Sequence, residues 1–301
     1  MMMDTQFLPE EIVTIRDLLR YTVTLYNEAG LYFGHGFPSA HEEASYLILH
    51  TLHLPFDQKN LWLDASLTEQ EKTKLFELIQ RRVVEKIPVA YLTHEAWLGD
   101  YRFYVDERTI VPRSFIAEVL LNDLDTWFKD PKAVKHVADL CTGGGSLAIL
   151  LALLFPEASV DAVDISKDAL EVAQINVSQY GLAHQIHLRH GDLFQALPSH
   201  KHYSLIISNP PYVDAETMSS LPAEYCAEPN LALASGEDGL DHIKRLLKEA
   251  PQHLAKNGIL IVEIGHNRAA LENAFPQLPF LFLSLPAGDD YVFVLRREDL
   301  L

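Results

Sequence analysis

Hydrophobic residues in the first third of the chain recur at helical spacing. Apolar positions from Ile12 to Tyr26 follow one another at steps of three or four residues, which predicts an amphipathic helix. Ser39 and Thr68 each stand three residues before a glutamate, and this capping-box pattern predicts the start of two further helices. We therefore expect residues 1–90 to form a small all-α domain.

The pattern then changes to an alternation of apolar and polar positions. Residues 91–105 are rich in Tyr, Trp, Phe and Val, and Gly99 is followed by Asp100 at their centre, which predicts a β-hairpin. We expect residues 91–112 to link two domains. A helix over residues 114–128 is expected to follow this linker.

From residue 136 onward, short apolar strands alternate with helical stretches. This order implies right-handed crossovers and a doubly wound, mostly parallel sheet. The last two apolar segments, joined by residues 286–290, instead predict an antiparallel C-terminal hairpin. We predict strands at residues 137–140, 159–163, 186–189, 204–207 and 259–263, and in the hairpin at residues 280–284 and 291–295. Residues 113–301 are therefore expected to form a Rossmann-like α/β domain.

Net charge limits the class of partner. The 301 residues include 24 basic and 42 acidic side chains, which gives a formal charge of −18. Because non-specific binding to DNA or RNA depends on Lys and Arg that neutralise phosphates, stable nucleic-acid binding is not expected. A basic protein is the partner that this charge favours.

Cysteine, histidine and hydropathy exclude other kinds of site. The two cysteines form no C-x-x-C pair, so no cysteine-based zinc site is predicted, and their scarcity fits a reducing cytoplasm. His184, His187 and His190 do not share one face of the predicted strand, so no metal site is expected there. The longest apolar run, residues 147–155, is about half of the roughly 20 residues that a membrane span requires.

Candidate chemistry begins where the first predicted strand of the sheet ends. Ligands bind beyond the carboxyl ends of strands in doubly wound sheets, and a glycine-rich loop lets the backbone approach a ligand closely. We expect the loop from Asp139 to Gly145 to bind a cofactor through Asp139, Cys141, Thr142, Gly143 and Gly145. Asp164 ends the next strand and is placed to bind two ribose hydroxyls.

Two cofactor classes fit this loop. Gly143, Gly145 and Ala148 satisfy one form of the dinucleotide fingerprint, so a nicotinamide dehydrogenase remains open. S-adenosylmethionine carries an amine that a carboxylate at Asp139 would suit, and Asp192 could accept a hydrogen bond from its adenine amino group. Carboxylates at three successive strand ends favour this cationic cofactor.

The sequence Asn209-Pro210-Pro211-Tyr212 directly follows an apolar strand. Proline restricts the preceding residue to extended geometry and removes backbone donors, so the motif presents a rigid row of acceptors. The side-chain oxygen of Asn209 and the carbonyl of Pro210 can each accept one hydrogen of a planar NH₂ group, while Tyr212 packs against its plane. This arrangement would direct the nitrogen toward a methyl donor.

Together these motifs resemble the HemK/Prm family of class I S-adenosylmethionine-dependent methyltransferases, which methylate glutamine side chains in proteins. The resemblance covers nearly the whole chain and includes further short stretches that begin at Val111, Glu228, Gly236 and Glu263. The resemblance implies a helical substrate-recognition domain, a linking hairpin and a catalytic domain. It also implies that Asn209, Pro210, Pro211 and Tyr212 are the catalytic residues.

Two branches of this family differ in substrate. Residues 112–118 read Pro-Arg-Ser-Phe-Ile-Ala-Glu, which is similar to the P-R-S-P-I-A-E of the branch that modifies ribosomal protein uL3, except for Phe115. The loop at residues 32–36 also resembles that branch, and we interpret His35 as a packing or docking residue. Arg81 and Arg82 are interpreted as a solvated helix face.

Other functions remain open from the residues alone. Peptide-release factors are the substrate of the second branch. Adenine presents the same planar NH₂ group, so a DNA or RNA adenine methyltransferase would share the motif at Asn209, although the acidic charge argues against it. A non-catalytic ribosome-assembly factor is a third alternative, which the intact motif opposes.

Overall fold

The computed structural model describes residues 9–285 and 288–301, and the chain forms two compact units. The helical unit extends through Glu95 and also contains the distant segment Pro222–Ala227. The second unit, called the sheet unit below, comprises Ala96–Leu221 and Glu228–Leu301. The chain therefore leaves the sheet unit once and returns to it.

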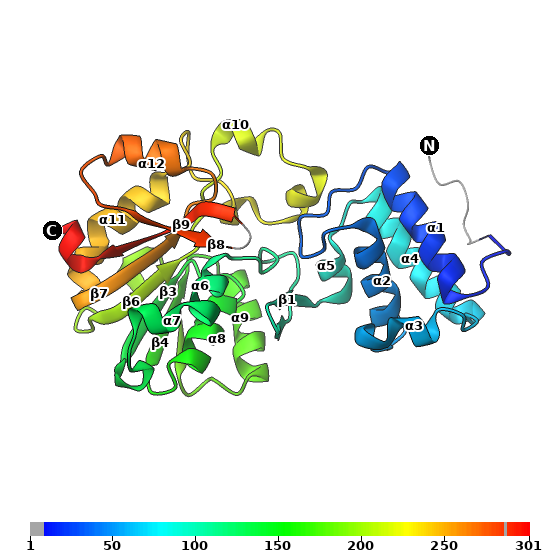
Figure 1. The fold of residues 1–301 in the computed structure, drawn as a ribbon, viewed down its shortest axis with the longest axis horizontal. Coiled ribbons are helices and arrows are strands. Elements are labelled where there is room, and N and C mark those ends of the chain that lie inside the picture. The colour runs from blue at the N-terminus through cyan, green and yellow to red at the C-terminus, as the bar shows by residue number, and fades with distance from the viewer. Residues whose placement is uncertain (1–8, 286–287) are drawn as a thin grey trace. The chain divides into compact units, whose positions relative to one another are not determined.

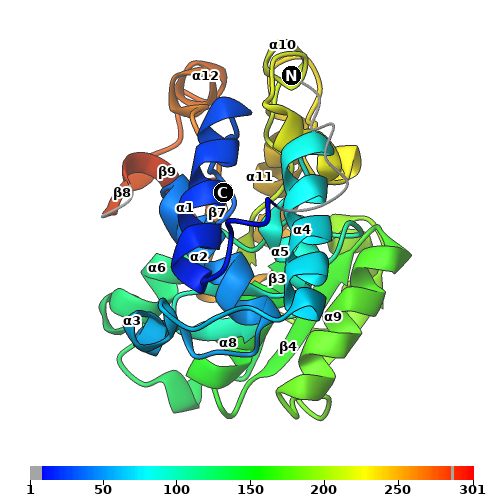
Figure 2. The same ribbon diagram turned by 90° about the vertical axis from the view of Figure 1, so that its right-hand side faces the viewer.

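The helical unit is built on three longer helices (Figure 2). Their apolar side chains form one hydrophobic cluster. Ser39 and Thr68 cap two of these helices as the sequence pattern predicts, and Thr14, which carries no such prediction, caps the first. Buried leucines on each of the three helices form the core. The helices are α1 (Ile15–Glu28), α2 (Ala40–Thr51), α3 (Lys59–Trp62), α4 (Glu69–Val84) and α5 (Val89–Thr93).

A seven-stranded sheet forms the centre of the other unit and confirms the predicted fold class. Its strand order is β5-β4-β3-β6-β7-β9-β8; the first five strands are parallel, and β9 is antiparallel to both neighbours. The strands are β3 (His136–Leu140), β4 (Ser159–Asp164), β5 (Ile186–His190), β6 (Tyr203–Ser208), β7 (Leu254–Glu263), β8 (Leu281–Leu285) and β9 (Gly288–Arg296). Part of the turn predicted at residues 286–290 lies outside the described residues.

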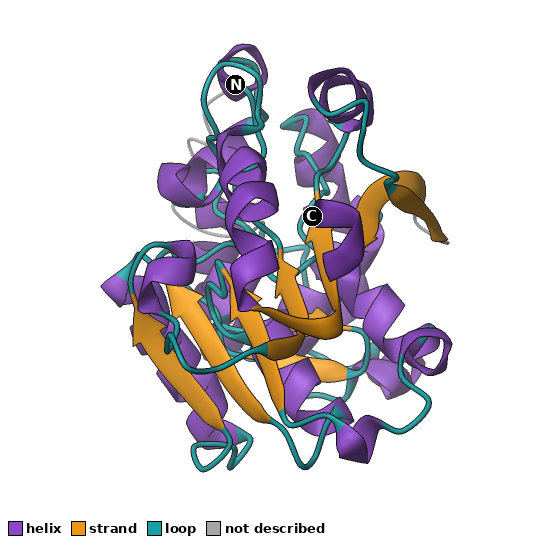
Figure 3. Ribbon diagram, turned by 90° about the vertical axis from the view of Figure 1, so that its left-hand side faces the viewer, coloured by secondary structure: helices purple, strands orange, loops and turns teal. Residues whose placement is uncertain are grey.

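Helices cover both faces of this sheet (Figures 1 and 3). Strand residues alternate between two hydrophobic clusters because successive side chains point to opposite faces, so Val137 and Ala138 belong to different clusters. One face packs against α6 (Ile116–Asn122), α8 (Ser146–Leu154) and α9 (Lys167–Gln179), and the other against α11 (Asp241–His253) and α12 (Arg268–Ala274). Two short helices, α7 (Leu124–Trp127) and α10 (Ala215–Met218), complete the set.

Local structure differs from the sequence expectation at two places. The hairpin is limited to β1 (Ala96–Leu98) and β2 (Tyr101–Phe103), because the residues before it form α5, in which Val89, Ala90, Tyr91 and Leu92 are all buried. The helix predicted over residues 114–128 is broken at Asp123, which separates α6 from α7. Asp is a poor helix former because its side chain competes for backbone hydrogen bonds.

The interpretation of Arg82 as a solvated residue is wrong. Arg81 is half exposed, but the Arg82 side chain is among the largest fully buried ones in the described structure. No helix in the described ranges is both long and apolar enough to cross a membrane.

Candidate functional site

A pocket of about 160 Å³ opens at the carboxyl ends of the central parallel strands. Cys141 and Gly143 reach it from the loop after β3, Asp164 from the end of β4, and Asn209 from the residue after β6. The other described residues that line it are Arg108, Thr109, Ile110, Val163, Ile165, Ser166, Ala169, Gly191, Asp192, Leu193, Pro211, Pro229, Leu231, Ala232, His242 and Arg245. This is the position at which doubly wound sheets bind ligands.

The loop after β3 adopts a backbone conformation that favours glycine. Gly143 has φ +54° and Gly145 has φ +80°. A Cβ on Gly145 would lie 3.1 Å from the Cβ of Ala173, whereas a Cβ on Gly143 would meet open space. Because Gly143 has no side chain, a ligand in the pocket can approach its backbone closely.

Two side chains fix this loop from outside the motif. Asp164 accepts hydrogen bonds of 2.8 Å from the backbone N–H groups of Gly143 and Ser166. Asn176 on α9 donates to the carbonyl oxygens of Gly144 and Tyr104, at 2.8 and 3.0 Å. The sequence analysis identified Asp164 but missed Asn176, which carries no motif signal.

Asp139 lies beneath the loop. Its side chain is fully buried, and one carboxylate oxygen accepts a 2.5 Å hydrogen bond from the Thr142 hydroxyl. Burial raises the pKa of Asp139 to about 7. Its other oxygen, Oδ1, has no hydrogen-bond partner among the described residues. A buried carboxylate with spare acceptor capacity is a group that an ammonium or an N–H donor would stabilise.

Asp192 is held by an arginine that the sequence analysis did not identify. The two terminal nitrogens of Arg245 donate to the two carboxylate oxygens of Asp192, each at 2.9 Å. His242, one turn earlier on α11, forms a 2.9 Å hydrogen bond between its Nδ1 and the Ser235 hydroxyl. Both α11 residues border the pocket, so this helix completes its wall.

Asn209 contributes a second unsatisfied polar atom to the site. Its Oδ1 is buried and has no hydrogen-bond partner within the described ranges, while its side chain borders the pocket. The preceding residue, Ser208, anchors the end of β6 by donating a 2.8 Å hydrogen bond to the carbonyl of Leu140. An acceptor left unsatisfied at a pocket wall is suited to an incoming donor.

Tyr212 is fixed by four neighbours. Its hydroxyl donates to Glu263 at 3.3 Å, and its carbonyl accepts a 2.6 Å hydrogen bond from the side chain of Asn267. A Cβ on Gly265 would lie 2.7 Å from the tyrosine ring, and one on Gly239 would lie 2.5 Å from its carbonyl oxygen. These glycines allow the motif to pack directly against backbone.

Two buried glutamates connect the remaining motifs of the sheet unit. Glu263 accepts hydrogen bonds from the Ser114 hydroxyl at 2.6 Å and the Phe115 N–H at 2.9 Å, and burial raises its pKa to about 7. Glu228 forms a two-pronged pair with Arg113, at 2.5 and 2.7 Å, and accepts the N–H of Val111. These two glutamates therefore join segments that are distant in sequence, and Glu263 also contacts Tyr212.

The predicted site residues fall into two groups. Cys141, Gly143, Asp164, Asp192, Asn209 and Pro211 border the pocket. Asp139, Thr142, Gly145, Pro210 and Tyr212 are not among the described lining residues; Asp139 is hydrogen-bonded to Thr142, and Tyr212 to Glu263. Arg108, His242 and Arg245 are polar lining residues that sequence reasoning missed.

Comparisons with known proteins agree with this geometry. Residues 116–236 match the family described as methyltransferase small domain, and residues 25–93 match the PrmC N-terminal domain. A ribosomal protein uL3 glutamine methyltransferase of Neisseria meningitidis serogroup B is 56% identical, covering 97% of this chain and 96% of its own. Proteins with the same description from Burkholderia pseudomallei and Bradyrhizobium diazoefficiens are 51% and 47% identical, over 97% and 96% of this chain and 97% and 92% of theirs. With its two units and its pocket, the chain belongs to the family of ribosomal protein uL3 glutamine methyltransferases.

Proposed function

We propose that the protein transfers a methyl group from S-adenosylmethionine to the side-chain amide nitrogen of a glutamine in ribosomal protein uL3. The carrying observation is the buried, unsatisfied Oδ1 of Asn209 in a side chain that borders the pocket. A glutamine amide offers the N–H donor that this oxygen lacks. The family membership supplies the substrate class.

The residues present fit the proposed cofactor. The glycine loop gives close backbone access at Gly143, and the carboxylate of Asp164 stands beside it, where ribose hydroxyls could donate. Asp139 and Asp192 add acceptors at neighbouring strand ends. When bound, S-adenosylmethionine would supply an electrophilic methyl carbon: its bond to sulfur would break as the bond to nitrogen forms, S-adenosylhomocysteine would leave, and the amide nitrogen would release one proton to water. The cluster of carboxylates suits the positive charge of the cofactor.

Asn209 and Pro210 act by positioning. An amide nitrogen is a poor nucleophile because its lone pair is delocalised, so close and oriented approach must provide much of the rate. The Asn209 oxygen and the Pro210 carbonyl accept hydrogen bonds from the two N–H groups of the substrate amide. They also stabilise the positive charge that develops on the nitrogen. The contacts of Tyr212 with Glu263 and Asn267 keep this short segment rigid.

The proposed partner agrees with the charge of the chain. A net charge of −18 attracts a basic ribosomal protein and disfavours stable binding to nucleic acid. We place the reaction in the cytoplasm, where unassembled ribosomal proteins are available. The helical unit is proposed to contribute to substrate recognition, as the resemblance of residues 25–93 to the PrmC N-terminal domain supports.

The test uses labelled S-adenosylmethionine and separate purified substrates that lack the modification. We expect label in uL3 and, after digestion, in one glutamine-containing peptide. Label in a peptide-release factor but not in uL3 would overturn the substrate assignment. Label in an adenine-containing oligonucleotide alone would overturn the class of reaction, and uL3 binding without label would indicate a non-catalytic function.

A further inference from the structure

A long loop connects the catalytic motif to the helical unit. Residues 213–234 begin directly after Tyr212, and the loop is closed at its base by backbone hydrogen bonds from Val213 to Leu233, at 2.8 Å, and from Ser235 to Val213, at 2.9 Å. Apart from the short helix α10 and two 3₁₀ turns the segment is irregular, and irregular connections longer than about 12–15 residues in compact domains are usually either functional or linkers. We call residues 213–234 the 213–234 loop.

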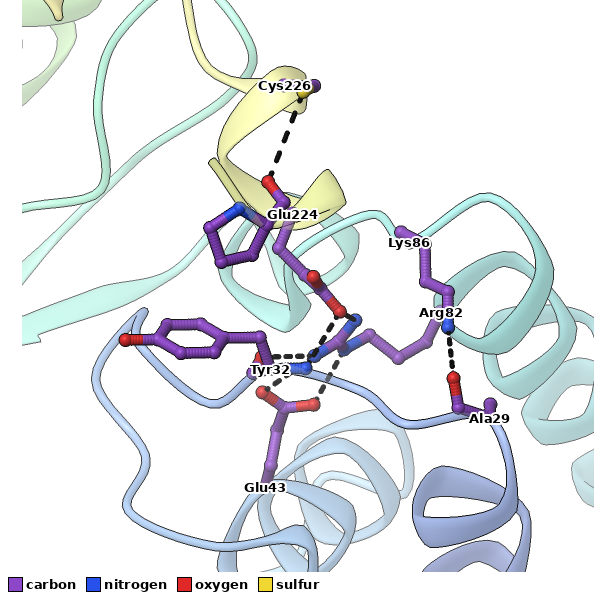
Figure 4. Close-up of polar contacts among 8 residues, drawn as sticks. Ala29, Tyr32, Glu43, Arg82, Lys86, Glu224 and Cys226 are labelled. Carbon is purple, nitrogen blue, oxygen red and sulfur yellow. Dashed lines mark hydrogen bonds and ion pairs between the residues drawn. The ribbon is translucent and has the colours of Figure 1, made fainter. Parts of the chain in front are cut away.

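The tip of the 213–234 loop, Pro222–Ala227, is part of the helical unit. Glu224 from this tip lies against Arg82 of α4, which donates to it at 3.1 Å and to Glu43 of α2 at 2.7 Å (Figure 4). The three side chains are 1–3% exposed. A single arginine thus joins two helices and the loop tip in a buried cluster.

The cluster also fixes the backbone of the loop at residues 31–38. Glu224 accepts the N–H of Tyr32 at 3.0 Å, and Arg82 donates to the carbonyl of the same residue at 3.0 Å (Figure 4). Buried ion clusters contribute little net stability compared with well-packed apolar residues of equal volume. Their geometry, however, specifies one arrangement of the groups that they join.

The returning limb of the 213–234 loop has its own anchor. Glu228 follows the tip and pairs with Arg113, while Pro229, Leu231 and Ala232 border the cofactor pocket. Release of the tip would therefore disorder the part of the loop around Pro222–Ala227 but leave the pocket wall held by Glu228. Because each part of the loop has its own anchor, loss of the anchor at the tip should leave cofactor binding unchanged.

We propose that Arg82 and Glu224 are positioning residues that hold the 213–234 loop in the conformation that binds the protein substrate. This inference rests on the proposed function. If the tip is released, the loop samples many conformations and must be ordered when the substrate binds. The apparent dissociation constant of the substrate is then the intrinsic value divided by the fraction of enzyme in the competent conformation, whereas turnover of the bound complex is unchanged.

Glu224→Ala is the main test because it spares the fold. Arg82 keeps its ion pair with Glu43 in this variant, so no buried charge is left unpaired. We expect KM for uL3 to rise about tenfold or more, as for a competent population of about 10%. We expect kcat and the dissociation constant of S-adenosylmethionine to stay within about twofold of the parent.

Two matched variants distinguish positioning from a general structural effect. Glu224→Gln keeps an oxygen that can accept from both Tyr32 and Arg82, so it should restore KM to near the parental value. Cys226→Ala changes an exposed residue of the same tip and should leave KM unchanged. Hydrogen exchange should show faster exchange of the Tyr32 N–H in Glu224→Ala but not in Glu224→Gln.

The outcomes separate this inference from the proposed function. Absence of uL3 methylation by the parent protein would overturn the proposed function, and the exchange comparison would still test the anchor. Parental methylation with an unchanged KM in Glu224→Ala would overturn the positioning role. A decrease in kcat alone, or an equal loss of cofactor affinity, would overturn it as well.

Discussion

Two glutamates of the 213–234 loop stand four positions apart and hold the chain in different ways. Glu224 pairs with Arg82 within the helical unit, and Glu228 pairs with Arg113 within the sheet unit. Both carboxylates are buried, and both also accept a backbone N–H. The first anchor fixes the tip of the loop within the helical unit, and the second joins the returning limb to Val111 and Arg113 within the sheet unit.

The contrast teaches that neighbouring residues can serve separate tasks when each has a partner in a different unit. Hydrogen bonds from Tyr32 and Arg82 hold the pKa of Glu224 below its usual range, although burial opposes this effect. On the pocket side, burial dominates and raises the pKa values of Asp139 and Glu263 to about 7. The two regions should therefore respond differently to mutation and pH.

The largest expected effect is on stability. Arg113→Met removes the guanidinium that pairs with Glu228, and Arg82→Met removes the one shared by Glu43 and Glu224. Each change should lower the free energy of unfolding by about 3–5 kcal/mol, the typical cost of breaking a buried ion pair. We expect Arg82→Met at the upper end, because it leaves two buried carboxylates. Urea unfolding measures the stability of both variants. If either variant is as stable as the parent, the anchoring role of its arginine is contradicted.

Asn209→Ala tests the pocket side alone. Loss of one positioning acceptor should lower kcat by about 10²–10³-fold, by analogy with the removal of one oxyanion-hole donor, or about 2.7–4 kcal/mol. Cofactor affinity and the melting temperature should change little, since Oδ1 makes no hydrogen bond to the described protein. Single-turnover methyl transfer at the parental rate would refute the proposed role of Asn209.

Stability should depend on pH in opposite directions at the two regions. Asp139 has an ordinary pKa of 3.8 and a folded value of about 7, so the native state binds more protons in this window. Its contribution therefore decreases as pH rises from about 4 to 7. Asp139→Asn should flatten this slope in urea titrations, and an unchanged slope would contradict the assignment.

Glu224 should show the reverse behaviour. Its folded pKa is lowered, so its contribution to stability is present above the ordinary value of 4.5 and is lost as pH falls through the folded value. Urea titrations at pH values below the folded pKa should show a smaller loss of stability in Glu224→Gln than in the parent. If both proteins lose the same stability in acid, the loss arises from other carboxylates.

The smallest effect concerns the approach of the substrate. Attraction between an acidic enzyme and a basic protein weakens as salt rises, because the Debye length is only about 10 Å at 0.1 M. KM for uL3 should increase several-fold between low and physiological salt, about evenly in the parent and in Glu224→Ala. A KM that does not respond to salt would leave the charge of −18 without a part in recognition.

Sequence reasoning located the pocket residues because they lie in short contiguous motifs. The loop after β3 and the segment from Asn209 each combine special backbone geometry with chemistry at one place. Asn176 and Arg245 could not be identified in this way. Their partners lie 72 and 53 positions away, and only the fold brings them together.

Arg82 shows a signal that was present but misinterpreted. It follows Ile79 by three positions and Leu75 by seven, so it belongs to the apolar stripe of α4 and not to the solvated face of Arg81. A charged residue on a buried stripe predicts a buried partner. The identity of Glu224 as that partner depended on the return of the chain to the helical unit.

The path of the chain also has a consequence during synthesis. Arg82 and Glu224 are separated by 142 positions. At about 5–20 residues per second, roughly 7 to 30 s pass between their appearance. The first-made unit thus remains incomplete until most of the sheet unit has emerged from the ribosome, so the two units cannot mature as independent modules.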